Sequence, residues 1–268
     1  MSKIEYHEDI KILKKSVKSR IKSIFIFFLF VFIVVGCFFT ANYLSSALTV
    51  GNLGGFLVYG DTSLKIEKKS LWAVVMGEYS SREEAEKVSL GAMVRGAGGY
   101  IWHEGSYFVI GNIYPNMLDA EKVLQNLKDS SYDIKIKEIV FPKLTLDFDA
   151  YENTDMGVIK KSIFSFDEVY ESLYEMSIKL DMKEITNYAV SSMISDKRGE
   201  IKSRIVSIQS LINTSDNYLG KIQEYLVKLD TLLDATIIKT IDGNVANYSL
   251  KYAITEVVRL KYDLYNAL

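Results

Sequence analysis

Few side chains in this sequence could perform covalent or metal chemistry. The 268 residues include one cysteine, Cys37, and two histidines, His7 and His103. A disulfide framework or a cysteine-based metal site needs several cysteines, and nucleophilic catalysis needs a base beside the nucleophile. No acid and base with a third, positioning group can be assembled from the other residues. We therefore expect a protein that is not an enzyme and that holds neither a metal ion nor a cofactor.

The charge of the chain gives no sign of a nucleic-acid partner. The 32 basic residues are nearly matched by 34 acidic ones, for a formal net charge of -2 at pH 7. Domains that bind nucleic acid usually show a basic excess on one face. An acidic stretch at residues 147–155 lacks the glycine and the spacing of a calcium-binding loop. We interpret that stretch as part of a solvated linker.

The sequence predicts a membrane segment near the N-terminus. No charged residue occurs from Ser23 to Gly60, and residues 24–41 are almost continuously Phe, Ile, Val and Leu. Such a run favours insertion, and with its milder extension it is long enough to cross a bilayer. We expect a cytoplasmic basic tail at 1–23, a transmembrane helix at 24–46 and a tether at 47–69.

Basic residues before this segment set its expected orientation. They are Lys11, Lys14, Lys15, Lys18, Arg20 and Lys22. By the positive-inside rule, the N-terminus stays in the cytoplasm and everything after the segment lies outside. The alternative is a cleaved signal peptide with Ser45-Ser46-Ala47 as its cleavage site, although the apolar region exceeds the usual length of about 7–15 residues.

A short pattern occurs twice between residues 71 and 140. Each copy is an apolar strand that stops at a glycine, followed by a turn and an amphipathic helix. The copies contain Val74-Val75-Met76-Gly77 with Ala85-Glu86-Lys87-Val88, and Val109-Ile110-Gly111 with Ala120-Glu121-Lys122-Val123. Two such units predict a βαββαβ sheet with both helices on one face. Gly77 and Gly111 are each expected to end a central strand.

These residues resemble the SPOR (sporulation-related repeat) domain. The resemblance covers about residues 71–140 and rests on the run Val75-Met76-Gly77-Glu78-Tyr79-Ser80, the Glu-Ala-Glu helix, the Gly-Gly before the hairpin and the second strand glycine. It implies a ferredoxin-like fold and binding of peptidoglycan, mainly glycan strands stripped of stem peptides at division septa. Family members often carry Gln or Arg at the positions of Val75 and Val109, so this chain would hold a glycan differently or not at all.

Strand pairing predicts which residues form the uncovered face of the sheet. With Glu104-Gly105 as a two-residue turn, Trp102 lies opposite Tyr107 and Tyr100 opposite Val109. The resemblance implies that Val109 faces outward, so Tyr100, Trp102 and Tyr107 face outward with it, and Ile101, Phe108 and Ile110 face the helices. Alternation on the last strand turns its lysines outward. The expected glycan-binding residues are Val75, Tyr100, Trp102, Tyr107, Val109, Lys135 and Lys137.

This face has two interpretations. Aromatic rings suit the apolar faces of sugars, and lysines would complement the carboxylates of muramic acid. Alternatively, a face this apolar is too adhesive to stay exposed and packs on the domain that follows.

The C-terminal half predicts an antiparallel bundle of amphipathic helices. After a SPOR-like domain at 70–142 and a linker at 143–163, apolar residues recur at helical spacing through 164–268. Ser165 with Glu168 is interpreted as the capping box that begins the first helix. The expected fold class is therefore α+β, with an N-terminal transmembrane helix.

Two functions are compatible with these patterns. The first is a single-pass protein of the cell membrane that binds peptidoglycan glycan strands outside the cytoplasm, in septum-associated division or in sporulation. The second is a membrane-anchored interaction scaffold, in which the sheet face packs internally and the helical domain recruits a division or sporulation protein.

Overall fold

The computed structural model describes residues 63–127, 132–148, 151, 153–212, 217–243 and 245–268. The expected basic tail and transmembrane helix, and most of the expected tether, lie outside the described residues. Among the described helices, none is both long enough and apolar enough to cross a membrane. The described part of the chain is α+β, with six helices and two antiparallel sheets.

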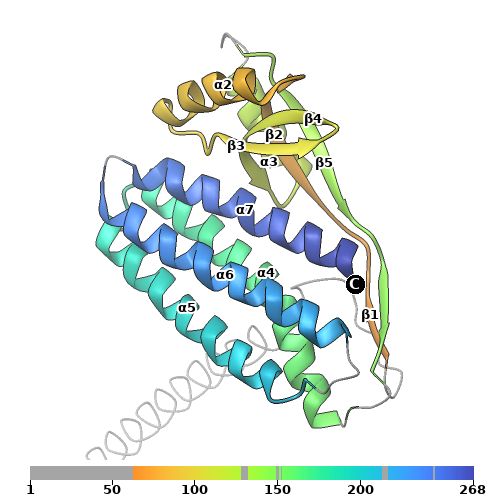
Figure 1. Ribbon diagram of the computed structural model, residues 1–268. Coiled ribbons are helices and arrows are strands. Elements are labelled where there is room, and N and C mark those ends of the chain that lie inside the picture. The colour runs from red at the N-terminus through yellow and green to blue at the C-terminus, as the bar shows by residue number, and fades with distance from the viewer. Residues whose placement is uncertain (1–62, 128–131, 149–150, 152, 213–216, 244) are drawn as a thin grey trace, which may run out of the picture. The chain divides into compact units, whose positions relative to one another are not determined.

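A four-stranded sheet carries the repeated pattern, in the strand order β3-β4-β2-β5 (Figure 1). Its elements are β2 (Lys69–Tyr79), α2 (Arg82–Val94), β3 (Tyr100–Glu104), β4 (Ser106–Tyr114), α3 (Met117–Asn126) and β5 (Lys135–Phe141). The expected βαββαβ order is confirmed. Both helices cover one face of the sheet, where Ala85, Ala92 and Ala120 pack on Val74 and Met76.

Side-chain caps explain where these two helices begin. The Ser81 hydroxyl accepts a hydrogen bond from the Glu84 amide, and acids occupy the first turn of α2, where the helix dipole favours negative charge. Asn116 caps α3 in the same way, because its side-chain oxygen accepts from the Asp119 amide at 2.9 Å. Each of the two helices therefore begins directly after a side-chain cap.

The central strands pair through two register shifts that the sequence pattern did not predict. Val74 pairs with Asn112, Val75 with Ile110, and the next pair joins residues 77 and 109. Residues 76 and 111 are thus extra residues in bulges. The expectation that Gly77 and Gly111 end their strands is wrong, because β2 continues to residue 79 and β4 to residue 114.

The hairpin between β3 and β4 is one residue shorter than expected. Only Gly105, with φ of 74°, separates the paired residues Glu104 and Ser106. Trp102 consequently pairs with Phe108, and Tyr100 pairs with residue 110. A shift of one residue exchanges the two faces of a strand, so half of the expected face assignment is wrong.

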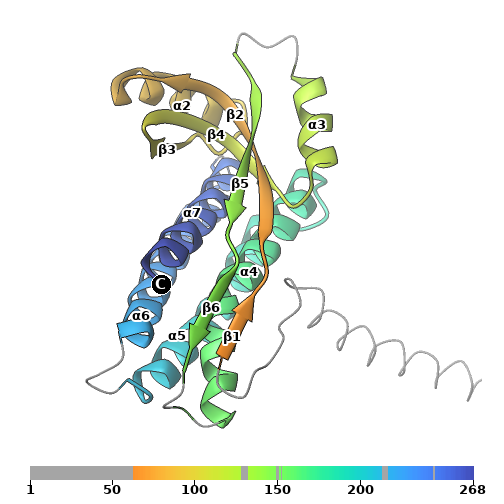
Figure 2. The same cartoon turned by 90° about the vertical axis from the view of Figure 1, so that its right-hand side faces the viewer.

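A narrow ribbon extends the sheet along the helical half of the molecule (Figure 2). In it, β1 (Ser63–Ile66) pairs with β6 (Leu144–Asp147). Pro142, which has no N–H to give to a ladder, lies between β5 and β6. The segment 143–163, expected to be a linker, instead contains β6 and the first turns of the next helix, and β1 lies in the expected tether.

Four helices form the expected antiparallel bundle, and consecutive helices run in opposite directions (Figure 1). They are α4 (Asn153–Asp181), α5 (Asn187–Gln209), α6 (Asn217–Ile241) and α7 (Ala246–Ala267). The capping box is wrong, because Ser165 lies inside α4 and donates to the Lys161 carbonyl at 3.0 Å. Glu168 instead pairs with Arg204 of α5 at 2.6 Å.

One hydrophobic core runs from the sheet into the bundle. Leu71 and Ile110 of the sheet belong to the same buried cluster as Phe166 of α4 and Ile254 of α7. The Tyr170 hydroxyl of α4 also donates to the carbonyl of Ile113 in β4 at 3.3 Å. The four-stranded sheet with α2 and α3 and the helical bundle therefore belong to one compact unit.

Candidate functional site

The face of the sheet that lies opposite α2 and α3 is covered by the helical half. Val75 is 0% exposed and Trp102 is 2% exposed, and both belong to the core that includes α4 and α7. Figure 1 shows α7 running directly beneath the sheet. The expectation of an uncovered platform is therefore wrong, and the alternative expectation of internal packing describes this face.

The predicted site residues do not all lie together. Val75, Tyr100 and Trp102 share the face toward α7, and Lys135 and Lys137 edge that face as expected. Two residues are on the wrong side in the expected assignment. They are Val109, fully buried in the cluster under α2 and α3, and Tyr107, packed against that same cluster.

The aromatic residues that were expected to bind sugar are engaged with other side chains. Tyr107 stacks on His103 with ring centres 4.4 Å apart. Tyr100 meets Tyr252 of α7 edge-on at 5.0 Å. Trp102 lies 4.8 Å below the guanidinium of Arg259, also from α7. Each of these three aromatic residues therefore already has a partner within the protein.

A buried ion cluster fastens the sheet to both flanking helices. Lys261 of α7 donates to Asp167 of α4 at 2.7 and 2.8 Å, and Lys69 of β2 donates to the same carboxylate at 2.8 Å. The side chains of Lys261 and Asp167 are each 5% exposed. Burial alone would raise the pKa of Asp167, but the two lysine charges outweigh it and hold that pKa below its ordinary value.

Sequence inspection missed this cluster, although a signal was present. Lys261 continues the apolar spacing of Leu250, Ile254 and Val257 and therefore lies on the buried stripe of α7. A lysine on such a stripe needs a buried partner. The partner's position could not be derived, because Asp167 is far away in the sequence.

Among the hollows at the surface of the described residues are two that border α7. One, of about 380 Å³, is lined by α2, the edge strand β3 and α7, with Arg82, Tyr100, His103 and Tyr107 among its walls. The other, of about 420 Å³, lies between α6 and α7. In the part of the chain that the structure describes, no group of His, Cys, Asp and Glu side chains could hold a metal ion.

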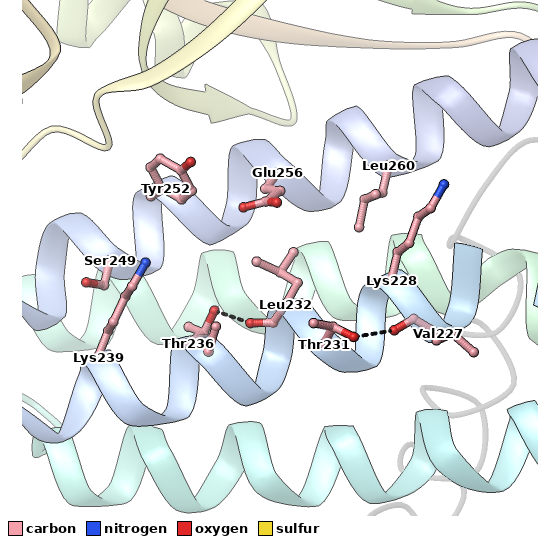
Figure 3. A pocket seen from close by; sticks show the side chains of 11 residues that line it. Val227, Lys228, Thr231, Leu232, Thr236, Lys239, Ser249, Tyr252, Glu256 and Leu260 are labelled. Atoms are coloured by element: carbon pink, nitrogen blue, oxygen red, sulfur yellow. Dashed lines mark hydrogen bonds between the residues drawn. The ribbon is translucent and has the colours of Figure 1, made fainter. Parts of the chain in front are cut away.

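The cleft between α6 and α7 is mainly apolar, with a few polar groups (Figure 3). Leu232 of α6 and Leu260 of α7 form its walls, and Glu256 lies between Tyr252 and Leu260 along α7. Lys228 and Lys239 of α6 stand toward its two ends. A largely apolar hollow with a few polar groups is the usual form of a binding site.

Comparisons of the chain with known protein families, with curated proteins and with solved structures found no match.

Proposed function

We propose that the protein is a non-enzymatic, membrane-anchored scaffold that recruits a division or sporulation protein through its helical half. The observation that carries the proposal is the burial of Val75 and Trp102 against α7 and α4. Side chains buried in this way are available to a glycan only if the sheet separates from the bundle. The membrane anchor and its orientation, with the described residues outside the cytoplasm, rest on the sequence pattern of residues 11–46.

An exposed apolar surface on the helical half supports the recruitment of a partner protein. Val227, Ile238 and Ile241 of α6 are 46%, 68% and 49% exposed. Their spacings of 11 and 3 residues bring them to one side of the helix. Apolar residues gathered on one exposed face often mark a surface that binds another protein.

Peptidoglycan binding is the second candidate function, and the hollow beside β3 favours it. Tyr100, His103 and Tyr107 present aromatic rings there, and Arg82 adds a positive charge. Such a site could hold a sugar that carries a carboxylate without opening the buried face. It would use only two of the seven residues that were expected to bind glycan.

The first test separates these two candidates. The full chain in detergent is mixed with purified peptidoglycan sacculi and sedimented. The scaffold proposal expects the wild-type chain to stay in the supernatant. It also expects Trp102→Ala to lower the free energy of unfolding by roughly 3–5 kcal/mol, because the change opens a cavity in the core. Tyr188→Ala on α5, where the side chain is 74% exposed, is the stability control.

The second test asks for the partner directly. A photocrosslinking residue at Ile238 should give one discrete adduct in cells, identified by mass spectrometry as a division or sporulation protein, and one at Glu83 of α2 should not. Sedimentation of the wild-type chain with sacculi, lost in Tyr107→Ala without loss of folding, would instead establish the second candidate.

A further inference from the structure

Three polar groups around the α6–α7 cleft are already bonded within the protein. The Thr231 hydroxyl donates to the Val227 carbonyl at 2.9 Å, and the Thr236 hydroxyl donates to the Leu232 carbonyl at 2.7 Å. Lys228 pairs with Glu224 at 2.8 Å. These contacts are made within α6 itself, so these groups have little need of a ligand.

Glu256 is different. Within the described residues its carboxylate has neither a hydrogen bond nor an ion pair, although it is half-buried between two helices. Burial raises the pKa of Glu256 above its ordinary value, and Lys239 offsets this effect without reaching the carboxylate. A carboxylate in a cleft with a raised pKa and no partner is a candidate for ligand binding.

A second polar group in the cleft lacks a partner as well. Ser249 is 4% exposed, and in the part of the chain that the structure describes its hydroxyl makes no hydrogen bond. A buried hydroxyl without a partner is costly, because it has lost its bonds to water. Ser249 precedes Glu256 by two turns of α7, so both polar groups belong to one wall of the cleft.

The shape of the cleft suits a helix. Lys228 and Lys239, near its two ends, are 11 residues apart on α6, which corresponds to about 16 Å or three turns. Its apolar walls lie beside the exposed stripe of Val227, Ile238 and Ile241. An amphipathic helix that lies in such a groove covers the apolar stripe and presents one side chain to each polar group.

We propose that this cleft binds an amphipathic helix of a partner protein and that a lysine or arginine of that helix reaches Glu256. The alkyl stem of the basic residue packs between Leu232 and Leu260. Its charged head gives the Glu256 carboxylate the hydrogen bonds that it lost to water on burial. The inference rests on the proposed scaffold function and adds the chemistry of the partner. The chain's own basic residues 11–22 are expected on the other side of the membrane.

The test uses a small probe in place of the unknown helix. Hexylammonium carries the charge and the alkyl stem of a lysine, and hexanol is the same chain without the charge. Both are titrated into the full chain in nanodiscs while the methyl resonances of Leu232 and Leu260 are followed by NMR. Hexylammonium should shift both resonances with saturation, and hexanol should bind more weakly.

Three variants give the expected pattern. Glu256→Gln, which keeps the shape, should weaken hexylammonium binding at least about tenfold, because a bond between two charged groups is lost. Glu200→Gln, an exposed carboxylate of α5, should leave binding unchanged. Lys239→Met should tighten binding, because it removes a like charge from the rim.

Two results would overturn the inference. Equal binding to the wild-type chain and Glu256→Gln would show that the carboxylate is not the counter-ion. Binding that is not tightened in Lys239→Met would show that the ammonium group does not lie in this cleft beside Lys239 and Glu256. Neither result bears on the scaffold function, which the sacculus and crosslinking experiments test separately. A chain that sediments with sacculi and also binds hexylammonium through Glu256 would keep this site and lose the scaffold function.

Discussion

Gly98 is the residue at which the connection between α2 and β3 meets α7 most closely. A Cβ atom at this position would lie 2.8 Å from the carbonyl carbon of Lys251 and 2.9 Å from the amide nitrogen of Tyr252. It would also lie 3.0 Å from the carbonyl oxygen of Gly111, to which the Gly98 amide donates. All three neighbours are backbone atoms, so they cannot move aside as a side chain can.

We expect Gly98→Ala to destabilise the protein by about 1–3 kcal/mol, because it forces α7 away from the sheet. Gly199→Ala is the matched control. Gly199 lies in the exposed middle of α5 with no atom near its Cβ position, and alanine there should stabilise the helix by about 0.5–1 kcal/mol. Urea unfolding of both variants measures the two effects. Changes of the same sign would contradict the tight approach at Gly98.

The side on which a residue lies could be predicted for some positions and not for others. Lys135 and Lys137 lie where strand alternation predicted, because Ile134 and Ile136 beside and between them pack under α2 and α3. Trp102 also lies on the predicted face, although the pairing with Tyr107 that placed it there is wrong. Tyr107 and Val109 do not, because the one-residue turn and the bulges shift the register of β4. Bulges depend on how two strands fit together, which the pattern of one strand does not contain.

At the scale of elements, the ion cluster makes α4, α7 and β2 depend on one another. Asp167→Asn should lower the free energy of unfolding by about 3–5 kcal/mol, because it leaves Lys261 buried without its counter-ion. Lys69→Met should cost about 1 kcal/mol or less, since the side chain of Lys69 is 27% exposed and the pair with Lys261 remains. Similar losses in the two variants would show that the cluster is not centred on the buried pair.

The pH dependence of stability checks the same cluster. The pKa of Asp167 is lowered in the folded protein, so its contribution is fully present above the unfolded value of about 4. That contribution should be lost as the pH falls from about 4 through the lowered pKa, because protonation breaks both ion pairs. In Asp167→Asn the free energy of unfolding should fall less steeply with decreasing pH than in the wild-type chain. Equal slopes in the two proteins would show that other carboxylates cause the acid unfolding.

Elements were predictable where a local signal specifies them. Ser81 caps α2 because its hydroxyl and the acids after it act within one turn. Ser165 and Glu168 show the same local pattern, yet α4 begins 12 residues earlier, as the first residue of that helix is Asn153. These two side chains make tertiary contacts instead of a cap. Arg204 of α5 donates to Ser165 at 2.7 Å and to Glu168 at 2.6 Å. Identical local signals can therefore have different uses.

At the scale of the whole described unit, the sheet and the bundle cover each other. The sheet has one face under α2 and α3 and the other under α7 and α4, so neither face is left bare. Sequence patterns identified both apolar surfaces, but they did not show that the two surfaces meet. That fact depends on shape and on contacts such as the one between Lys69 of β2 and Asp167 of α4, which join distant segments.

The shared core predicts that the sheet and the bundle unfold together. Trp72 and Trp102 are the two tryptophans of the chain, so Trp72→Phe leaves Trp102, at the sheet–α7 interface, as the only fluorescent reporter of that kind. Circular dichroism of the same sample reports the helices. In urea the two signals should change at one midpoint, because α7 cannot leave the sheet without exposing the core.

The control is Trp102→Phe, in which Trp72 reports from the side of the sheet under α2 and α3. Its fluorescence should change at the same urea midpoint as the helical signal, since the βαββαβ part unfolds together with the bundle. A fluorescence change of Trp102 well before the loss of helix would mean that the sheet separates while the bundle stays folded. The buried face would then be available after all, and peptidoglycan binding through Val75, Tyr100 and Trp102 would replace the scaffold as the better proposal.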